Sequence, residues 1–551
     1  MDTPTEPGER TIRLVSGPIP YQLAIQQDQN MIHEAGYVAA AAAFDGQLWE
    51  ARHAMAALTR HHLGLGDRDV CIVTLTSRWL RGSFNVCIPI EVQSPSSSRQ
   101  LMLRCAMPHK LAEARHPGSV DEKVGCEVGA YAWVQERCPD IRVPFLYGFG
   151  FSDHRHFTHE ACRPWYVRVA RCLWRQLYGL LGRSAFLSRY ISQPTAHCIP
   201  TAYMLLEQVG SPTSQMLSNT FQKLRADPAR RRNLFRGIAR PMISLARIPQ
   251  PRIGSFRFHD NGTVSLTNRP LSCPITMLEN DGTPRTIHTN DTYLCTEPFV
   301  ADMLRFHDGR FLSHLNAVYD DKDCRGEMAA KVMLRALAHR YIRHDFRNGP
   351  FVLQLTDFHA SNIFVDDEWN ITCLIDLEWI CALPAEMLAA PYWLTGGATD
   401  GIRKGLAEFD AVQAEFTDAF EEEERKAVAA ARYGLPMSLT QVIRKSWESG
   451  AVWFWHSLMS TNAMYPLFTH HICPRFSPHR LLFREEELMS RIWSEDAAQV
   501  VKRKVEEHQQ YEEELKSLFG QGTHLLATPN ESGDNCTQDS ASVSPEERIV
   551  T

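Results

Sequence analysis

The sequence lacks any run of about 18 consecutive apolar residues, the length that a membrane-spanning helix requires. Its N-terminus, MDTPTEPGERTIRLVSGPIP, is polar and contains proline, so no signal peptide is predicted. The fifteen cysteines include no C-x-x-C pair and no Cys/His cluster at zinc spacing, which is typical of reduced thiols. These absences together predict a cytoplasmic protein without a transmembrane segment.

An excess of positive charge is also absent. The formal net charge is −6 and no long basic run is present, so nucleic acid is not an expected partner. Polar residues dominate both ends of the chain. We therefore predict an N-terminal extension, partly disordered, over residues 1–45 and a disordered tail over residues 523–551.

The 551 residues are too many for one compact core, so two or more lobes are expected. Residues 46–206 predict an antiparallel β-rich lobe of the α+β class, in which a helix at 121–138 follows three strands. A further helix is expected at 48–65, where Gly66 is a plausible C-cap. The expected strands are VCIVTLTSRW, SFNVCIPIEV, QLMLRCAM, VPFLYGFGF and AYMLLEQVG.

The pattern becomes mainly helical after a short link near Glu207, which predicts a larger C-terminal lobe over 207–400 and a helical region over 401–522. The exception is a hairpin in the stretch FVLQLTDFHASNIFVDDEWNITCLIDLEW. Its strands are expected at Ile363–Val365 and Ile371–Ile375, on either side of a polar five-residue loop.

Three polar residues gather at the open end of this hairpin. An antiparallel ladder places Asn362 and Asp376 beside each other, about 5 Å apart, and Asp357 lies in the loop just before. Hard oxygen donors of this kind suit Mg²⁺, and the loop aspartate is placed to accept a proton. Any one of these residues alone would more simply be a turn former, but all three together predict a phosphoryl-transfer site.

This motif resembles the aminoglycoside phosphotransferase family, small-molecule kinases with a two-lobed protein-kinase-like fold. The family writes the region as H-G-D-x-H-x-x-N followed by I-D, and here it reads LTDFHASN and IDLEW, so His359 matches the second His while Leu355 and Thr356 depart from it. The resemblance implies that Asp357 is the catalytic base and that Asn362 and Asp376 bind Mg²⁺. More narrowly, the chain resembles fungal phosphotransferase-domain proteins of unassigned substrate.

The resemblance extends over roughly residues 75–395 and implies an ATP site. WLRGSFNVCIPI is similar to the family's nucleotide loop, which would place Gly82, Ser83 and Asn85 near the phosphates, although a plain hairpin turn has the same pattern. Arg104 stands where the family has a basic residue on its third strand.

An acidic partner for that basic residue is expected on the following helix. Glu127 fits best and Glu122 is the second choice, whereas an unpaired surface arginine and helix glutamate would be the plainer interpretation. YMLLEQVG resembles the strand that connects the lobes, so the backbone from Glu207 to Val209 would contact the adenine.

Two segments do not belong to a minimal kinase. A helical insertion at about 155–200 carries Arg168, Arg171 and Arg175 at helical spacing; it could lie on a membrane surface or act as a lid, but packing on the first lobe is the favoured interpretation. An acidic run at 421–424 is expected to be a solvated helix face.

Two functions follow from these observations. The first is an ATP- and Mg²⁺-dependent phosphotransferase acting on a hydroxyl or amine of an unidentified small molecule. The second is a weak or inactive kinase-like scaffold that binds a protein partner through its long C-terminal helices. A protein kinase is disfavoured because no A-P-E pattern follows Asp376.

Overall fold

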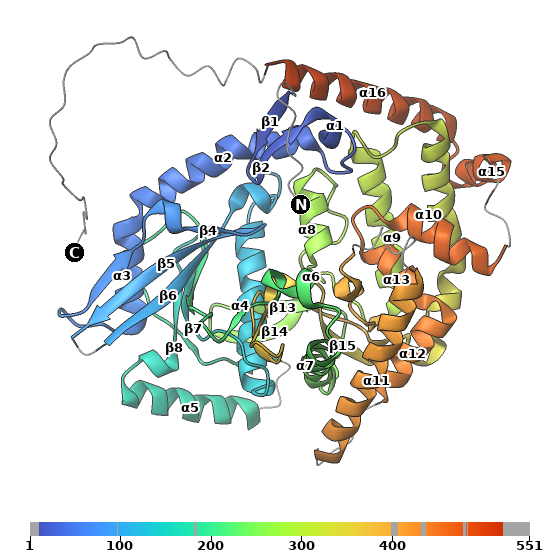
Figure 1. The fold of residues 1–551 in the computed structure, drawn as a ribbon. Helices are drawn as coiled ribbons and strands as arrows, with labels where there is room; N and C mark the ends of the chain where they lie inside the picture. The colour runs from blue at the N-terminus through green and yellow to red at the C-terminus, as the bar shows by residue number, and fades with distance from the viewer. Residues whose placement is uncertain are drawn as a thin grey trace, which may run out of the picture.

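The computed structural model describes residues 10–95, 97–180, 185–397, 406–430, 437–477, 481 and 483–521. It is a mixed α/β structure in which every strand pair among these residues is antiparallel (Figure 1). The strands of the N-terminal half lie on one side of the molecule and most helices of the C-terminal half on the other.

An eight-stranded sheet forms the centre of the N-terminal part, in the order β10-β8-β7-β11-β6-β5-β3, with β4 paired to β5. All five strands expected in this region from the sequence are present. The strands are β3 (Val70–Val73), β4 (Leu80–Arg81), β5 (Asn85–Ser94), β6 (Ser97–Ala106), β7 (Leu146–Gly150), β8 (His156–His159), β10 (Tyr190–Ser192) and β11 (Tyr203–Glu207).

Side chains alternate between the two faces of this sheet, and each face is covered by helices. Leu205 packs in the same cluster as α2 (Met31–Glu50) and α3 (Arg52–Leu63), whereas its neighbour Leu206 packs with α4 (Ser119–Arg137). On β6 the same alternation sends Leu103 toward α2 and α3, so Arg104 projects toward α4. The strand period therefore positions the first basic residue of the site.

The C-terminal part contains two further sheets, which corrects the prediction that it is helical apart from one hairpin. One sheet has the order β12-β16-β17 and the other β15-β18-β13-β14-β9. The strands are β9 (Phe186–Leu187), β12 (Gln215–Met216), β13 (Gly254–Phe258), β14 (Thr263–Asn268), β15 (Phe351–Leu355), β16 (Ile363–Val365), β17 (Ile371–Leu374) and β18 (Ile380–Pro384). An Asn261-Gly262 turn, with φ +78° at the glycine, joins β13 to β14 and is the hairpin signal that the sequence offered.

Helices make up the rest of this part, and none of the described helices is long and apolar enough to cross a membrane. They are α6 (Phe221–Leu224), α7 (Pro228–Ala246), α8 (Cys273–Asn280), α9 (Thr296–Ser313), α10 (Asp321–Tyr341), α11 (Leu406–Ala430), α12 (Leu439–Ser449), α13 (Ala451–Met459), α14 (Met464–Leu467), α15 (Phe483–Trp493) and α16 (Ala497–Gln521). The expected helical insertion contains α5 (Trp165–Leu180).

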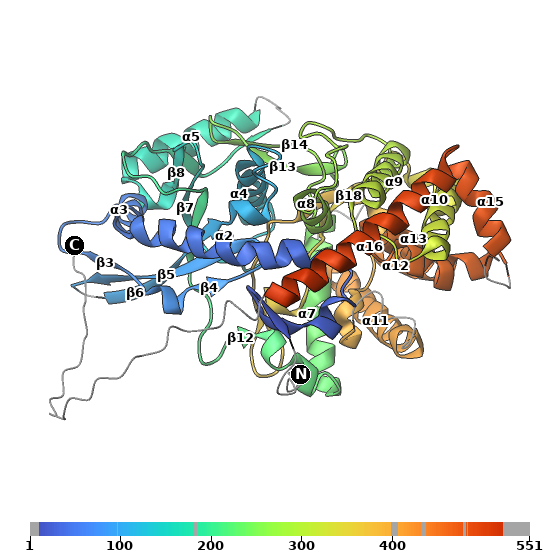
Figure 2. The ribbon, with the colours of Figure 1, turned by 90° about the horizontal axis from the view of Figure 1, so that it is seen from above.

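The N-terminal extension has more structure than the sequence predicted. A hairpin of β1 (Thr11–Leu14) and β2 (Gly17–Pro20) leads through α1 (Tyr21–Ala24) into α2. This segment packs against α16, close to the other end of the described chain (Figure 2). Residues 1–9 and the tail predicted to be disordered lie outside the described residues.

Candidate active site

The hairpin of β16 and β17 brings the predicted metal ligands to one end. Ile363 pairs with Leu374, and the backbone N–H of Ile375 donates to the carbonyl of Asn362 at 3.0 Å. The Asn362 side chain in turn donates from Nδ2 to the Asp357 carbonyl at 2.9 Å. The asparagine thereby fixes the loop that carries the predicted base.

Asp376 lies two residues after the end of β17, in a left-handed backbone conformation with φ +64°. Aspartate tolerates this region better than a β-branched residue does. At this turn the carboxylate meets the sheet of the N-terminal part, where Nη2 of Arg104 lies 2.6 Å from Oδ1 of Asp376. The pair joins β6 to the hairpin end across 272 residues of sequence.

Arg104 is the centre of a buried ionic cluster. Its guanidinium also binds Glu127 of α4, the partner that the sequence favoured, and Glu378 at 2.9 Å. Lys123 binds the same two glutamates, at 3.1 Å for Glu127. Glu127, Asp376 and Glu378 each have one carboxylate oxygen within 4.8 Å of the others. Such a group of oxygens could bind a metal ion.

Sequence reasoning missed Lys123 and Glu378, both nearly inaccessible to solvent. Burial alone would raise the pKa of Glu378, but Lys123 and Arg104 hold it well below its ordinary value. The available signals were Lys123 one helical turn before Glu127 and the extra acidic residue in IDLEW.

The residues of the predicted nucleotide loop have two different environments in the structure. Gly82 and Ser83 form the exposed turn between β4 and β5, where the Gly82 N–H donates to the Asn85 carbonyl at 2.9 Å. The Asn85 side chain is buried, donates to Glu378 at 3.0 Å and accepts from Lys123 at 2.7 Å. Asn85 therefore belongs to the ionic cluster rather than to the exposed turn.

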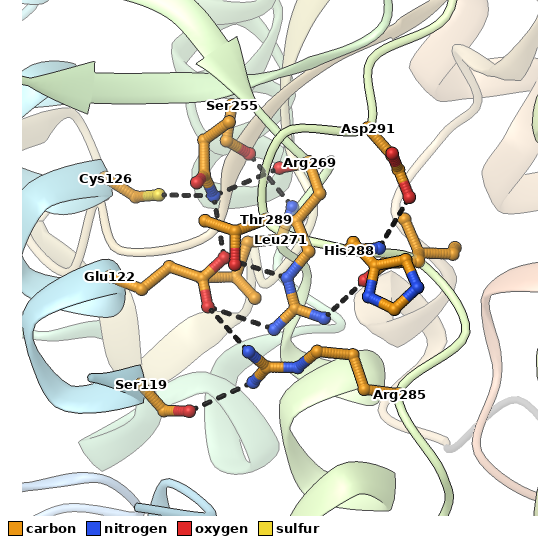
Figure 3. Close-up of polar contacts among 12 residues, drawn as sticks. Ser119, Glu122, Cys126, Ser255, Arg269, Leu271, Arg285, His288, Thr289 and Asp291 are labelled. Carbon is orange, nitrogen blue, oxygen red and sulfur yellow. Dashed lines mark hydrogen bonds and ion pairs between the residues drawn. The ribbon is translucent and has the colours of Figure 1, made fainter. Parts of the chain in front are cut away.

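Glu122, the second choice for the Arg104 partner, binds a different arginine. Its carboxylate accepts from Nε of Arg269 at 2.8 Å, and Arg285 lies 3.7 Å away (Figure 3). Arg269 is fully buried and also binds Glu279 of α8. This network connects α4 to α8 of the C-terminal part, next to the Arg104 cluster, so in the described structure Glu122 stabilises the contact between these two parts.

A cavity of about 350 Å³ opens beside the loop that carries Asp357. Asp357 and His359 line it, and the His359 Nε2 lies 3.6 Å from Oδ1 of Asp357. This contact raises the pKa of His359 above its ordinary value. Most of the remaining lining is apolar or aromatic: Met242, Leu245, Cys273, Pro274, Leu353, Leu355, Phe358, Leu383, Met387, Leu388, Ala389, Ala390, Pro391, Tyr392, Trp393, Val452, Trp455 and Met459. The other lining residues are polar: Gln354, Thr356, His456, Ser460, Thr461 and Asn462.

Two side chains hold the Asp357 loop in place. The indole Nε1 of Trp393 donates to the Phe358 carbonyl, and the Thr356 hydroxyl donates to the Trp379 carbonyl at 2.7 Å. Thr356 occupies the position of the family's usual glycine, so this departure supplies an additional tether. Trp393 comes from the PYWLTG segment, whose contribution sequence reasoning did not identify.

Glu207 and Val209 lie where β11 ends and the chain passes toward β12. The Glu207 carboxylate accepts from Arg142 at 2.6 Å and from the Phe145 N–H at 3.0 Å. Its backbone N–H donates to the Phe145 carbonyl at 2.8 Å. The N–H of Glu207 is thus already used within the sheet, and any contact with adenine by this segment stays a prediction.

No protein-family model matches the chain, and no curated protein matches it. Among solved structures the chain is similar to an ethanolamine kinase from Plasmodium vivax, with 10% identity and a TM-score of 0.32, over 78% of this chain and 82% of that one. It is also similar to spectinomycin phosphotransferase APH(9)-Ia, solved with ADP and spectinomycin, with 12% identity and a TM-score of 0.23, over 75% of this chain and 92% of that one. Both TM-scores are too low to support a fold or a function.

Proposed function

We propose that the chain is an ATP- and Mg²⁺-dependent phosphotransferase with a kinase-like fold that acts on a small-molecule acceptor. The observation that carries the proposal is that two aspartates near one end of the hairpin have different surroundings. Asp357 opens into a cavity, whereas Asp376 faces the Arg104 cluster at the end of the N-terminal sheet. Phosphoryl transfer needs a residue that orients the acceptor next to a metal and nucleotide site.

The donor set suits Mg²⁺. Asn362 and Asp376 offer an amide and a carboxylate oxygen, and Mg²⁺ favours such hard ligands while it keeps waters and binds substrate phosphates. Arg104 contacts Oδ1 of Asp376, so Oδ2 is the atom that we assign to the metal. Glu127 is held by Arg104 and Lys123 through different oxygens, which makes it a support rather than a ligand.

Charge in the cluster supports the same assignment. Burial raises the pKa of Asp376 to about 7. When all three carboxylates are ionised, they exceed the two cations, Arg104 and Lys123, by one negative charge. A divalent cation at Asp376 would reverse that sign, which favours the phosphates of a nucleotide. The magnesium, when bound, would neutralise charge on the transferred phosphoryl group, and Arg104 would hold Asp376 in its place.

Asp357 would orient the acceptor and accept its proton. Among the described residues that line the cavity, Asp357 is the one carboxylate. A polyamine would leave its other ammonium groups without a partner there, at a large desolvation cost. The apolar and aromatic lining therefore favours an acceptor with a hydroxyl group and an apolar body over a polycationic one.

A specific observation also favours the second candidate, the inactive kinase-like scaffold. Asp376 is already paired with Arg104, and a pair that never opened or shared the carboxylate would keep it from binding metal. The two candidates differ in whether MgATP is bound and in whether its phosphate is transferred.

Transfer of labelled γ-phosphate to a panel of hydroxyl and amine compounds tests the proposal. Asp357→Asn is expected to lower transfer by at least about 100-fold while the affinity for MgATP is retained, because general-base contributions are of this size. Asp367→Asn is the matched control, since this aspartate lies in the exposed loop of the same hairpin. Transfer that survives in Asp357→Asn would exclude the assigned role.

A further inference from the structure

Helix α5 presents an apolar face to solvent. None of its residues is buried, and seven large apolar or aromatic side chains are 49–85% exposed. These are Trp165, Tyr166, Val169, Leu173, Trp174, Leu177 and Leu180. Trp165 and Trp174 are the two tryptophans with large exposure among all described residues. The helix lies at the periphery of the molecule, where it contacts β9 and the short turn Glu160–Cys162, and no other described helix covers it (Figure 1).

The polar side of α5 faces the protein instead. The guanidinium of Arg171 donates to the carbonyls of Ser188 and Tyr190 at 2.7 and 2.8 Å. Arg175 binds Glu136 at 2.5 Å and Glu160 at 3.1 Å. At 100° per residue, Leu173 lies roughly opposite Arg171 and Arg175 around the helix. The expectation that α5 packs its apolar side on the sheet is therefore wrong, because arginine contacts hold the helix the other way round.

An exposed apolar patch of this kind is rare on a monomeric soluble protein and usually marks an interaction site. The helix is about 24 Å long at 1.5 Å per residue, so the patch extends well beyond a single side chain. The contacts of Arg171 and Arg175 fix the orientation of α5 about its axis, so the same face of the helix is kept exposed to solvent.

Charge in this segment identifies the kind of partner. Residues 161–206 contain six arginines and no aspartate or glutamate, although the whole chain has a net charge of −6. Arg175 and Arg189 are paired with Glu136 and Glu160, and Arg171 donates to backbone carbonyls beside Glu160. Arg168 is exposed on the helix, at the border of the apolar face. An apolar face with tryptophan and tyrosine beside an exposed arginine such as Arg168 is typical of a helix that lies in a lipid headgroup region.

We infer that α5 attaches the protein peripherally to a membrane that contains anionic lipids. The tryptophans and leucines would enter the boundary between headgroups and acyl chains, and Arg168 would contact lipid phosphates. A second copy of the chain is a poorer occupant, because it would bring two acid-free, arginine-bearing segments together. The inference does not depend on the proposed phosphotransferase activity.

Vesicle sedimentation of the full chain tests the inference. Vesicles of phosphatidylcholine alone are compared with vesicles in which about one third of the lipid is phosphatidylserine, at low and high salt. The variant Leu173→Glu/Leu177→Glu places two charges on the apolar face. The matched control Leu488→Glu/Ile492→Glu has the same spacing on α15, where these side chains are 57% and 63% exposed. Melting curves and circular dichroism establish that each variant is folded.

The wild type and the α15 control are expected to bind the anionic vesicles at least about tenfold more strongly than neutral ones, less so at high salt. The α5 variant and Arg168→Glu are expected to lose most of this binding. The inference is overturned if the wild type does not sediment with anionic vesicles or if the α5 variant still does. It is also overturned if α5 instead forms a dimer, seen as a change in sedimentation velocity that the α5 variant abolishes.

Discussion

Nη2 of Arg104 lies 2.6 Å from Oδ1 of Asp376, and this contact joins the N-terminal sheet to the predicted metal end of the hairpin. The same guanidinium contacts Glu127 and Glu378, so one buried cation holds a carboxylate of α4 and two carboxylates of the segment between β17 and β18. The geometry makes Arg104 both a structural centre and the residue that positions Asp376.

Arg104→Met is expected to destabilise the protein by about 3–5 kcal/mol, because it leaves three carboxylates facing Lys123 alone. Urea unfolding followed by tryptophan fluorescence measures the change. Arg99→Met on the same strand is the control, since Arg99 is exposed and its removal should cost less than about 1 kcal/mol. Equal stabilities for the two variants would show that the buried cluster does not form.

Parts of this site could be predicted from the sequence. The D-x-x-x-x-N spacing and the hairpin signal located Asp357, Asn362 and Asp376, and the period of two along β6 agrees with the expected pairing of Arg104 with Glu127. Lys123 and Glu378 could not be placed in the same way. Their partners are brought together by tertiary folding, and a buried lysine looks like a surface residue in sequence.

The same limit applies to two amphipathic segments. The acidic run 421–424 was expected to face solvent, but Glu423 and Glu424 are buried, where Glu424 accepts from the Leu439 and Thr440 N–H groups at the start of α12. In α5 the helical period is present, but which face turns inward depends on carbonyls and carboxylates far along the chain. The helical period shows which residues share a face of a helix, but it does not show whether that face packs on the protein or faces solvent.

The pH dependence of stability should contain a contribution from Glu386. Burial raises the pKa of this carboxyl to about 7, and its Oε1 has no hydrogen-bond partner among the described residues. Because the folded state holds the proton more tightly, this contribution is fully present below about pH 4 and is lost as the pH rises toward 7.

Glu386→Gln should therefore gain stability relative to the wild type between pH 5 and pH 8, by up to about 3 kcal/mol at the higher pH. Urea unfolding at several pH values measures the difference. Glu408→Gln, at a glutamate 54% exposed in α11, should show little pH dependence. A difference that is constant with pH for Glu386→Gln would contradict the raised pKa.

Docking of the N-terminal segment on α16 depends on a buried contact between Met31 and Tyr511. The Met31 N–H donates to the tyrosine hydroxyl at 3.1 Å. Tyr511→Phe leaves that N–H without an acceptor and should cost about 1–3 kcal/mol, with faster amide exchange at the start of α2. Tyr319→Phe removes an exposed hydroxyl that donates to Asp28, and it should change stability by less than about 1 kcal/mol. Unchanged exchange in Tyr511→Phe would argue against this docking.

The Asp357 loop should open more readily when Trp393 loses its indole donor. Trp393→Phe removes the hydrogen bond to the Phe358 carbonyl, worth about 1 kcal/mol, so amide exchange over residues 357–362 should be several-fold faster. Trp455→Phe is the control in the same cavity, because its Nε1 has no partner among the described residues. Equal exchange in both variants would exclude the bracing role of Trp393.

The central claim is tested most directly by thermal unfolding with MgATP, with ATP plus EDTA, and in the variant Asp376→Asn. A ligand that binds the native state at about 100 times its dissociation constant stabilises it by roughly 2.7 kcal/mol, which is readily measured as a rise in Tm. We expect a rise that depends on magnesium in the wild type and is lost in Asp376→Asn. The absence of any rise at millimolar MgATP would contradict the phosphotransferase proposal and favour the inactive scaffold.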